Sequence, residues 1–367
     1  MIARLSFYPV VEPDKVNYQR RDKARFQRDR ERMMRVLAFV TSVLLGSMAI
    51  APASAQGLPP PGEIEPVSGN LYKIFGGGGN TLVYVQQDGV VLIDTKLPNN
   101  GQAILDQVRA VTDKPVTTII YSHNHPDHIG STDFFREQFP DVRVIAHENA
   151  KTWMEASPQI GAELLPDETF ADHLTVGEGD ERIELHYFGV AHTNNDTFIV
   201  FPKERTMFPG DVMAWDMSPL IDPGTGGSML LLPETVEKVA ASITGVDIVV
   251  EGHGAINSWD NFLRFAEFNR AVLTAAQGAL ERGDAPAAAV AEVEANPKFA
   301  PLLDTRLKEG LEYGNTPRAR AHMNVNVAYQ ELSGEPVTTN FGGALPETDK
   351  HPGSDAADVA MPGAPAR

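Results

Sequence analysis

Short apolar runs alternate with amphipathic patterns through the middle of the chain. Runs rich in Val, Ile, Leu and Phe, bounded by Gly, Asp or Pro, predict buried strands. These predicted strands cover residues 71–75, 81–86, 90–94, 116–121, 142–146, 183–189, 196–201, 206–209 and 246–250. Amphipathic patterns predict helices over 103–111, 148–156 and 234–242, and another helix-like pattern starts at Ile129. Strands that alternate with helices are typical of an α/β fold.

The pattern becomes helical after Asn257, with helices predicted over 262–281, 285–294 and 306–332. We expect this α-helical extension to pack on the preceding domain through its alanine-rich face. The tail from Gly342 is rich in Pro, Gly, Ala and Asp, which predicts disorder. Gly76–Gly79 joins two strands and lacks a following Gly-Lys-Ser/Thr, so we interpret it as a hairpin and not a phosphate loop.

The first 55 residues differ from the rest. Residues 28–35 are basic, 36–51 are almost wholly apolar, and Ala53-Ser54-Ala55 is a small-residue cleavage pattern. This arrangement predicts a secretory signal peptide cleaved after Ala55, a periplasmic or secreted protein, and no stable membrane insertion afterwards. An uncleaved anchor is the alternative. The predicted divisions are 1–55 (N-terminal extension and signal peptide), 56–257 (catalytic domain), 258–335 (helical extension) and 336–367 (disordered tail).

Charge and cysteine content restrict the chemistry. The chain of 367 residues has a net charge of −18 and no cysteine, so a metal site would use His, Asp or Glu. The first 55 residues hold ten Lys and Arg and five Asp and Glu, which leaves 21 basic and 44 acidic residues and a net charge of −23 in the remainder. So acidic a surface would repel a phosphate backbone, which argues against a nucleic-acid partner.

The stretch from Ser122 to Gly130 concentrates the candidate chemistry. It reads Ser-His-Asn-His-Pro-Asp-His-Ile-Gly, with three histidines and a carboxylate in six consecutive residues. Pro126 favours a turn there, and the run directly follows a predicted buried strand. Imidazole and carboxylate are the usual non-thiol ligands of zinc, so His123, His125, Asp127 and His128 are candidate metal ligands.

The pattern His-x-His-x-Asp-His resembles the signature of the metallo-β-lactamase superfamily. Three further motifs match that family's order: Gly189-Val190-Ala191-His192-Thr193, Pro209-Gly210-Asp211 and Gly252-His253-Gly254. The resemblance covers roughly residues 71–257. It implies an αββα sandwich, with two mixed sheets between layers of helices, followed here by the C-terminal α-helical extension.

The resemblance also implies a site and a reaction. His123, His125 and His192 would hold one metal ion, Asp127, His128 and His253 the other, and Asp211 would bridge them. Two Zn²⁺ per chain are expected, with Fe or Mn possible, and Asp127 and His253 are the expected catalytic residues. A metal-bridging hydroxide would cleave an ester, lactone, thioester or amide bond of a small-molecule substrate. Asp94 matches an aspartate that supports the metal loop in similar proteins.

Alternatives to this hydrolase differ in particular features. The commonest metallo-β-lactamases have a cysteine where Asp211 stands, which weakens β-lactam hydrolysis as the activity without excluding it. A mononuclear iron dioxygenase of the same fold, such as a persulfide dioxygenase, would bind one iron. The interpretation as a non-catalytic binding protein is weakened because all seven ligand positions are occupied by residues that can bind a metal. Flavodiiron-type electron transfer is disfavoured because Glu typically stands at the position of His125.

The remaining histidines, namely His147, His173, His186, His322 and His351, are interpreted as structural or surface residues. Residues 212–232 are the candidate substrate-facing loop, where exposed Met213, Trp215 and Met217 would suit an apolar ligand. The competing interpretation is that these side chains pack under the C-terminal helices.

Overall fold

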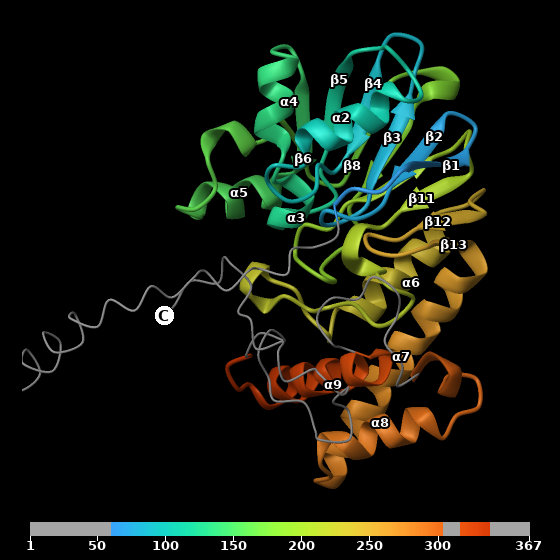
Figure 1. The fold of residues 1–367 in the computed structure, drawn as a ribbon. Helices are drawn as coiled ribbons and strands as arrows, with labels where there is room; N and C mark the ends of the chain where they lie inside the picture. Colours follow the sequence, from blue (N-terminus) through green and yellow to red (C-terminus); the bar gives the residue numbers. More distant parts are fainter. Residues whose placement is uncertain (1–59, 304–315, 338–367) are drawn as a thin grey trace, which may run out of the picture. The chain divides into compact units, whose positions relative to one another are not determined.

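Two mixed β-sheets form the centre of the fold in the computed structural model, which describes residues 60–303 and 316–337 (Figure 1). The first sheet contains seven strands in sequence order: β1 (Ile64–Ser68), β2 (Leu71–Ile74), β3 (Thr81–Val85), β4 (Val90–Ile93), β5 (Val116–Ile120), β6 (Arg143–His147) and β7 (Glu168–Phe170). Strands β1 to β4 pair antiparallel through tight turns, as expected for Gly76–Gly79. Strands β4 to β7 pair parallel, because helices connect them.

The second sheet has the order β13-β12-β11-β10-β9-β8. Its strands are β8 (His173–Val176), β9 (Ile183–His186), β10 (Phe198–Phe201), β11 (Thr206–Phe208), β12 (Ile248–Val250) and β13 (Ile256–Ser258). Only β11 and β12 pair parallel, and helix α6 (Leu232–Ser242) lies between them in sequence.

Three apolar clusters define the layers. Alternate residues of a strand point to opposite faces, so Leu82 and Tyr84 pack between the sheets while Val83 packs on the outer face of the first sheet. Phe201 and Phe208 contribute to the cluster between the sheets from the second sheet. The outer cluster of the second sheet joins its strands to α6 and the C-terminal helices. This is the predicted four-layer α/β sandwich.

Helices cover both outer faces. Those of the first half are α2 (Gly101–Arg109), α3 (Pro126–Ile129), α4 (Thr132–Gln138) and α5 (Glu148–Ala156). The C-terminal extension consists of α7 (Trp259–Arg282), α8 (Pro286–Glu294) and α9 (Pro317–Ser333), drawn in orange and red in Figure 1. Its buried alanines and aromatic residues continue the outer cluster of the second sheet, so the extension packs on the sandwich as expected.

Several sequence expectations need correction. Residues 57–66 are polar and rich in proline, and no strand is predicted before residue 71, yet Ile64–Ser68 forms an edge strand with no fully buried residue. Asp127 and His128 lie in the short helix α3, which begins at Pro126, three residues before the helix-like pattern that starts at Ile129. The predicted helix over 306–332 is described only from Pro317 onward.

The signal peptide, the cleavage site and most of the tail from 336 lie outside the described residues, and the domain boundaries stay predictions. Within residues 60–303 and 316–337, no helix combines the length and apolar character that a membrane span requires.

Candidate metal centre

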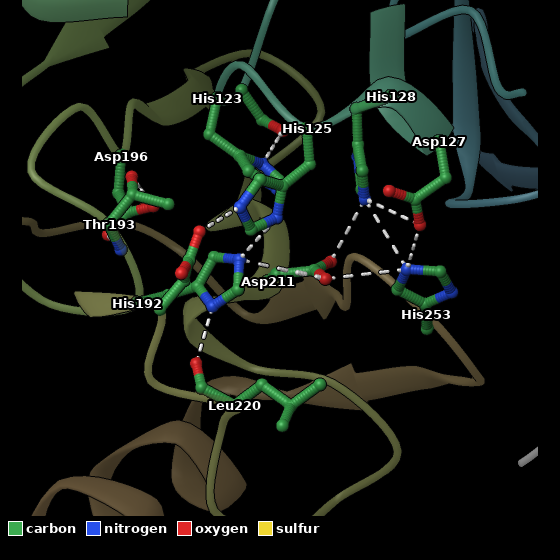
Figure 2. Close-up of polar contacts among 12 residues, drawn as sticks. His123, His125, Asp127, His128, His192, Thr193, Asp196, Asp211, Leu220 and His253 are labelled. Carbon is green, nitrogen blue, oxygen red and sulfur yellow. Dashed lines mark hydrogen bonds and ion pairs between the residues drawn. The ribbon is translucent and has the colours of Figure 1, made fainter. Parts of the chain in front are cut away.

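The seven predicted ligands converge on one place, although four separate loops carry them (Figure 2). His123 and His125 follow β5, and Asp127 and His128 lie in α3. The other three come from further along the chain: His192 after β9, Asp211 after β11 and His253 after β12. Strand ends therefore deliver every candidate ligand, as the sequence pattern predicts.

The ligand atoms form three overlapping groups, and the atoms within each group lie within 4.8 Å of one another. The groups are His123, His125 and His192; His123, His128 and Asp211; and Asp127, His128 and His253. The first and third groups match the two ligand sets expected from the resemblance. Asp211 lies between them, with Oδ1 3.2 Å from His128 Nε2 and Oδ2 4.0 Å from His192 Nε2.

Two histidines of the first group donate a hydrogen bond away from the centre. His192 Nδ1 donates to the carbonyl oxygen of Leu220 at 2.5 Å, and His125 Nε2 donates to Asp222 Oδ2 at 2.8 Å. Each bond fixes the ring orientation and places the proton on the outward nitrogen. The inward nitrogens, His192 Nε2 and His125 Nδ1, therefore present lone pairs.

A second set of bonds centres on Asp94, which is completely buried. His128 Nδ1 donates to Asp94 Oδ2 at 2.7 Å, and Ser122 Oγ donates to the same oxygen at 2.6 Å. Ser122 Oγ lies 3.0 Å from His123 Nδ1 and can accept a hydrogen bond from this nitrogen. Asp94 therefore orients one histidine directly and another through Ser122, the supporting role that the sequence suggests for it.

The inward nitrogens fit a bound cation. His192 Nε2 lies 3.1 Å from His125 Nδ1, and His128 Nε2 lies 3.3 Å from His253 Nε2. Nitrogen pairs at such distances can share at most one proton. His123 Nε2 is buried and has no hydrogen-bond partner. Buried polar atoms rarely stay unpaired, so convergent lone pairs beside two carboxylates are the donor set a divalent metal requires.

The surroundings shift the pKa values of these histidines in different directions. Burial, followed by repulsion from His125, lowers the pKa of His192 to about 4, and burial also holds the pKa of His123 well below its usual range. Burial acts the same way on His253, but Asp211 and Asp127 outweigh it and raise the pKa of His253 to about 9. In the first group, burial lowers the pKa of His125, but the hydrogen bond to Asp222 outweighs burial and raises it, so only His123 and His192 are held neutral by their surroundings.

Glycines let the backbone approach the ligands closely. A Cβ on Gly79 would lie 2.2 Å from His128 Cε1, and one on Gly252 would lie 2.1 Å from Asp211 Oδ1. The buried Lys96 fixes the first of these loops, because its Nζ donates to the carbonyl oxygens of Gly79 and Ile74 at 2.8 and 2.7 Å. The small residues beside the ligands are therefore a steric requirement of the site.

Contacts between loops fix the position of His192. The backbone N–H of Thr193 donates to Asp196 Oδ2 at 2.9 Å, and its hydroxyl donates to Oδ1 at 2.7 Å (Figure 2). Burial raises the pKa of Asp196 to about 7. The backbone N–H of Thr197 donates to the carbonyl oxygen of Ser122 at 2.7 Å, which joins this loop to the one that carries His123.

Sequence reasoning missed the outer partners Leu220 and Asp222. Both lie in the 212–232 loop, which was noted for Met213, Trp215 and Met217 as possible exposed substrate contacts. These three side chains are buried, so they are not the exposed contacts that the sequence suggests. Met213 packs in the cluster that includes the C-terminal helices, as the competing interpretation holds, whereas Trp215 and Met217 form a small cluster with Ala214. Asp222 carried a sequence signal only as the start of an Asp-Pro-Gly turn, and a carbonyl partner such as that of Leu220 carries none.

The other described histidines stay apart from the centre. His147 caps α5 and stacks on Tyr187, and His173 pairs with His186 across β8 and β9. No metal-ligand group found among residues 60–303 and 316–337 includes these three or His322. His351 lies outside the described residues.

Comparison with known proteins supports the resemblance to this family. A sequence model described as the metallo-beta-lactamase superfamily matches residues 74–214, which include every candidate ligand except His253. This part of the chain is therefore similar to a metallo-β-lactamase superfamily domain. The resemblance drawn from the His-x-His-x-Asp-His motif is confirmed over these residues.

Individual relatives are distant. The metallo-beta-lactamase IND-1 of Chryseobacterium indologenes is 23% identical over 228 residues, which are 59% of this chain and 89% of that protein. The 2,4-dinitroanisole O-demethylase subunit alpha of a Nocardioides strain is 31% identical over 153 residues, 41% of this chain and 45% of that protein. The sec-alkylsulfatase Pisa1 from Pseudomonas shares the fold with a TM-score of 0.57 at 16% identity, over 73% of this chain and 50% of that one.

Proposed function

We propose that this chain is an exported dinuclear zinc hydrolase that cleaves an ester, lactone, thioester or amide bond of a small molecule. The observation that carries the proposal is the pair of ligand groups, His123, His125, His192 and Asp127, His128, His253, on either side of Asp211. A mononuclear iron dioxygenase would need one such group, so the second group favours hydrolysis. A binding protein would not need the hydrogen bonds that orient four of the histidine rings, namely His123, His125, His128 and His192.

Zinc suits the donor set because all seven ligands are imidazole nitrogens or carboxylate oxygens, with no thiolate in the chain. When bound, a pair of divalent ions lowers the pKa of water toward neutrality and polarises the scissile carbonyl group. The residues of the chain would orient these ions and manage the proton. The outward bonds to Leu220, Asp222 and Asp94 direct the inward ring nitrogens of His192, His125 and His128 toward the candidate metal positions.

Asp127 and His253 are the residues that we assign to the reaction. Asp127 Oδ2 lies 3.1 Å from His253 Nε2, and the Asp127 side chain is 15% exposed, so it can contact water and ligand. Addition of water to the substrate carbonyl gives a tetrahedral adduct. When this adduct collapses, the bond to the leaving group breaks and a proton from the water must reach that group. We assign this transfer to the Asp127 carboxylate.

The relatives suggest which substrates to test. Two named β-lactamases, IND-1 and the type 2 enzyme of Bacteroides fragilis, justify a β-lactam, although Asp211 replaces the cysteine of the commonest type. The relative named as an O-demethylase subunit adds an aryl methyl ether. Lactones and thioesters complete the panel, because a ligand set with aspartate at this position resembles the glyoxalase- and lactonase-like branch.

The proposal is tested with residues 56–367 reconstituted with Zn²⁺. The unaltered protein should hydrolyse at least one member of the panel, and His125→Ala should lower that turnover by about 10⁴-fold or more, the order lost when one group of a catalytic ensemble is removed. His173→Ala removes a histidine outside the site and should leave turnover unchanged. Equal turnover in the His125→Ala protein would refute the assignment.

Export is supported by the basic, apolar and small-residue segments of the first 55 residues. We expect mass spectrometry of periplasmic protein to give Gln56 as the first residue. Intact Met33 in a membrane fraction would contradict the proposed cleavage.

A further inference from the structure

One loop, residues 214–222, contacts histidines of both ligand groups. The ring of Trp215 stacks on the ring of His253, with centroids 4.4 Å apart and planes inclined by 21°. Further along, Leu220 accepts the hydrogen bond of His192, and Asp222 accepts that of His125. The loop therefore contributes an outer contact to three of the five candidate histidine ligands.

The loop adopts an unfavourable backbone. Trp215 and Asp216 have φ angles of +54° and +52°, which residues with a side chain rarely adopt. Glu251 stabilises this turn, because its two carboxylate oxygens accept from the Asp216 N–H at 3.0 and 3.1 Å. The Trp215 N–H donates to the carbonyl oxygen of His253 at 2.9 Å. Strained backbone that is held by several contacts is characteristic of functional sites.

The C-terminal helices hold the same loop through buried polar side chains. Asn324 of α9 donates from Nδ2 to the carbonyl oxygen of Pro219 at 3.0 Å, next to Leu220. The guanidinium of Arg320, also on α9 and completely buried, lies 6.0 Å from the Trp215 ring centroid. Asn269 of α7 accepts from the Ser218 hydroxyl at 3.0 Å. Apolar residues would suffice if these helices only covered the sheet.

We propose that helix α9 is part of the metal centre, and that Asn324 and Arg320 are positioning residues for different ions. Asn324 fixes the segment whose carbonyl orients His192 of the first group. Arg320 fixes Trp215, which supports His253 of the second group by stacking. The inference rests on the proposed function, because it requires two ions to be bound.

Two single variants and a control separate the two effects. Asn324→Ala removes the bond to Pro219, and Arg320→Met removes the charge while it keeps much of the side-chain length. Tyr329→Phe, also on α9, removes a hydroxyl that donates to the carbonyl oxygen of Asp284 and is remote from the loop. The affinity for each Zn²⁺ is measured by competition with a chromophoric chelator, and thermal unfolding checks that each variant is folded.

Partners of metal-binding histidines commonly contribute 10- to 100-fold to metal affinity. Asn324→Ala should therefore lower the affinity for the first ion about tenfold and that for the second less than twofold. Arg320→Met should lower the affinity for the second ion about tenfold and that for the first less than twofold. Tyr329→Phe should change neither. Unchanged affinities in both variants, or equal losses that Tyr329→Phe reproduces, would overturn the proposal.

A fluorescence measurement covers the case in which a variant fails to fold. The chain has three tryptophans, Trp153, Trp215 and Trp259. With Trp153 and Trp259 replaced by Phe, the emission of Trp215 should change when the second Zn²⁺ binds and not when the first binds. If the Trp215 emission does not change when the second Zn²⁺ binds, the proposed role of Trp215 and Arg320 is wrong.

Different results would refute the proposed function and the proposed role of α9. A parent protein that binds two ions but hydrolyses no substrate of the panel would refute the proposed function, while the affinity pattern would still decide the role of α9. A parent that binds fewer than two ions would refute both.

Discussion

Replacement of Asp94 by Asn should impair metal binding while it keeps the shape of this completely buried side chain. Asp94 accepts three hydrogen bonds, from the Ser122 N–H at 2.7 Å, the Ser122 hydroxyl at 2.6 Å and His128 Nδ1 at 2.7 Å. An asparagine has one acceptor oxygen in the place of two. In one orientation its NH₂ group faces the Ser122 N–H, and in the other it faces His128 Nδ1 and the Ser122 hydroxyl.

The second orientation alters the tautomer of His128. If Nδ1 must accept a hydrogen bond, the proton moves to Nε2, the nitrogen that lies 3.2 Å from Asp211 and faces the candidate metal position. The lost bond is one between a histidine and a buried carboxylate, and bonds to charged groups contribute about 1.5–3 kcal/mol. With about 1.4 kcal/mol per tenfold change, the second ion should bind roughly 10- to 100-fold more weakly.

Chelator competition with Zn²⁺ measures this loss, and calorimetric unfolding checks the fold. The affinity for the first ion should also fall, by a smaller factor, because Asp94 orients His123 only through Ser122. Asp133→Asn, an exposed aspartate in the first turn of α4, is the matched control. If Asp94→Asn binds both ions within twofold of the parent and keeps its turnover, the assigned role of Asp94 is wrong.

Three other predictions concern the same centre. Gly79→Ala should abolish binding of the second ion, since its Cβ would lie 2.2 Å from His128 Cε1, whereas Gly62→Ala, with 3.6 Å to its nearest neighbour, should bind normally; equal affinities would refute the steric argument. Asp211→Ala should weaken the binding of both ions, and Asp211→Cys should retain the second ion better than Asp211→Ala does. A metal assay that finds two tightly bound ions in the Asp211→Ala protein would exclude a bridging role. Chelation should lower the melting temperature by about 5–10 °C, because ions bound only by the folded state stabilise it by roughly 2–3 kcal/mol at a hundredfold excess over Kd, and an unchanged melting curve would show that no ion binds.

The sequence predicts the ligands better than their supports. His123, His192 and His253 each follow an apolar run, the family resemblance implies that they share one site, and the structure brings these strand ends together. The supports depend on tertiary contacts. Leu220 acts through a carbonyl group that any residue possesses, and Trp215 reaches His253 only because a strained turn directs it there.

In the fold, too, elements with a clear local pattern could be predicted, whereas those that depend on tertiary contacts could not. Strands with continuous apolar runs, such as 90–93, and the helix over 148–156 follow from periodicity. The edge strand 64–68 pairs on one side only and exposes polar residues, so its pattern resembles that of a loop. The burial of Met213 could not be predicted locally, because this side chain packs in a cluster that the C-terminal helices complete.

Anomalous X-ray scattering at the zinc absorption edge, from crystals of residues 56–367 grown with Zn²⁺, tests the two-ion centre most directly. We predict two peaks per chain about 3.5–4 Å apart, the spacing of two-metal hydrolases. One peak should lie among His123, His125 and His192, and the other among Asp127, His128 and His253, with Asp211 between them. A single peak, or peaks outside these ligand groups, would contradict the dinuclear site.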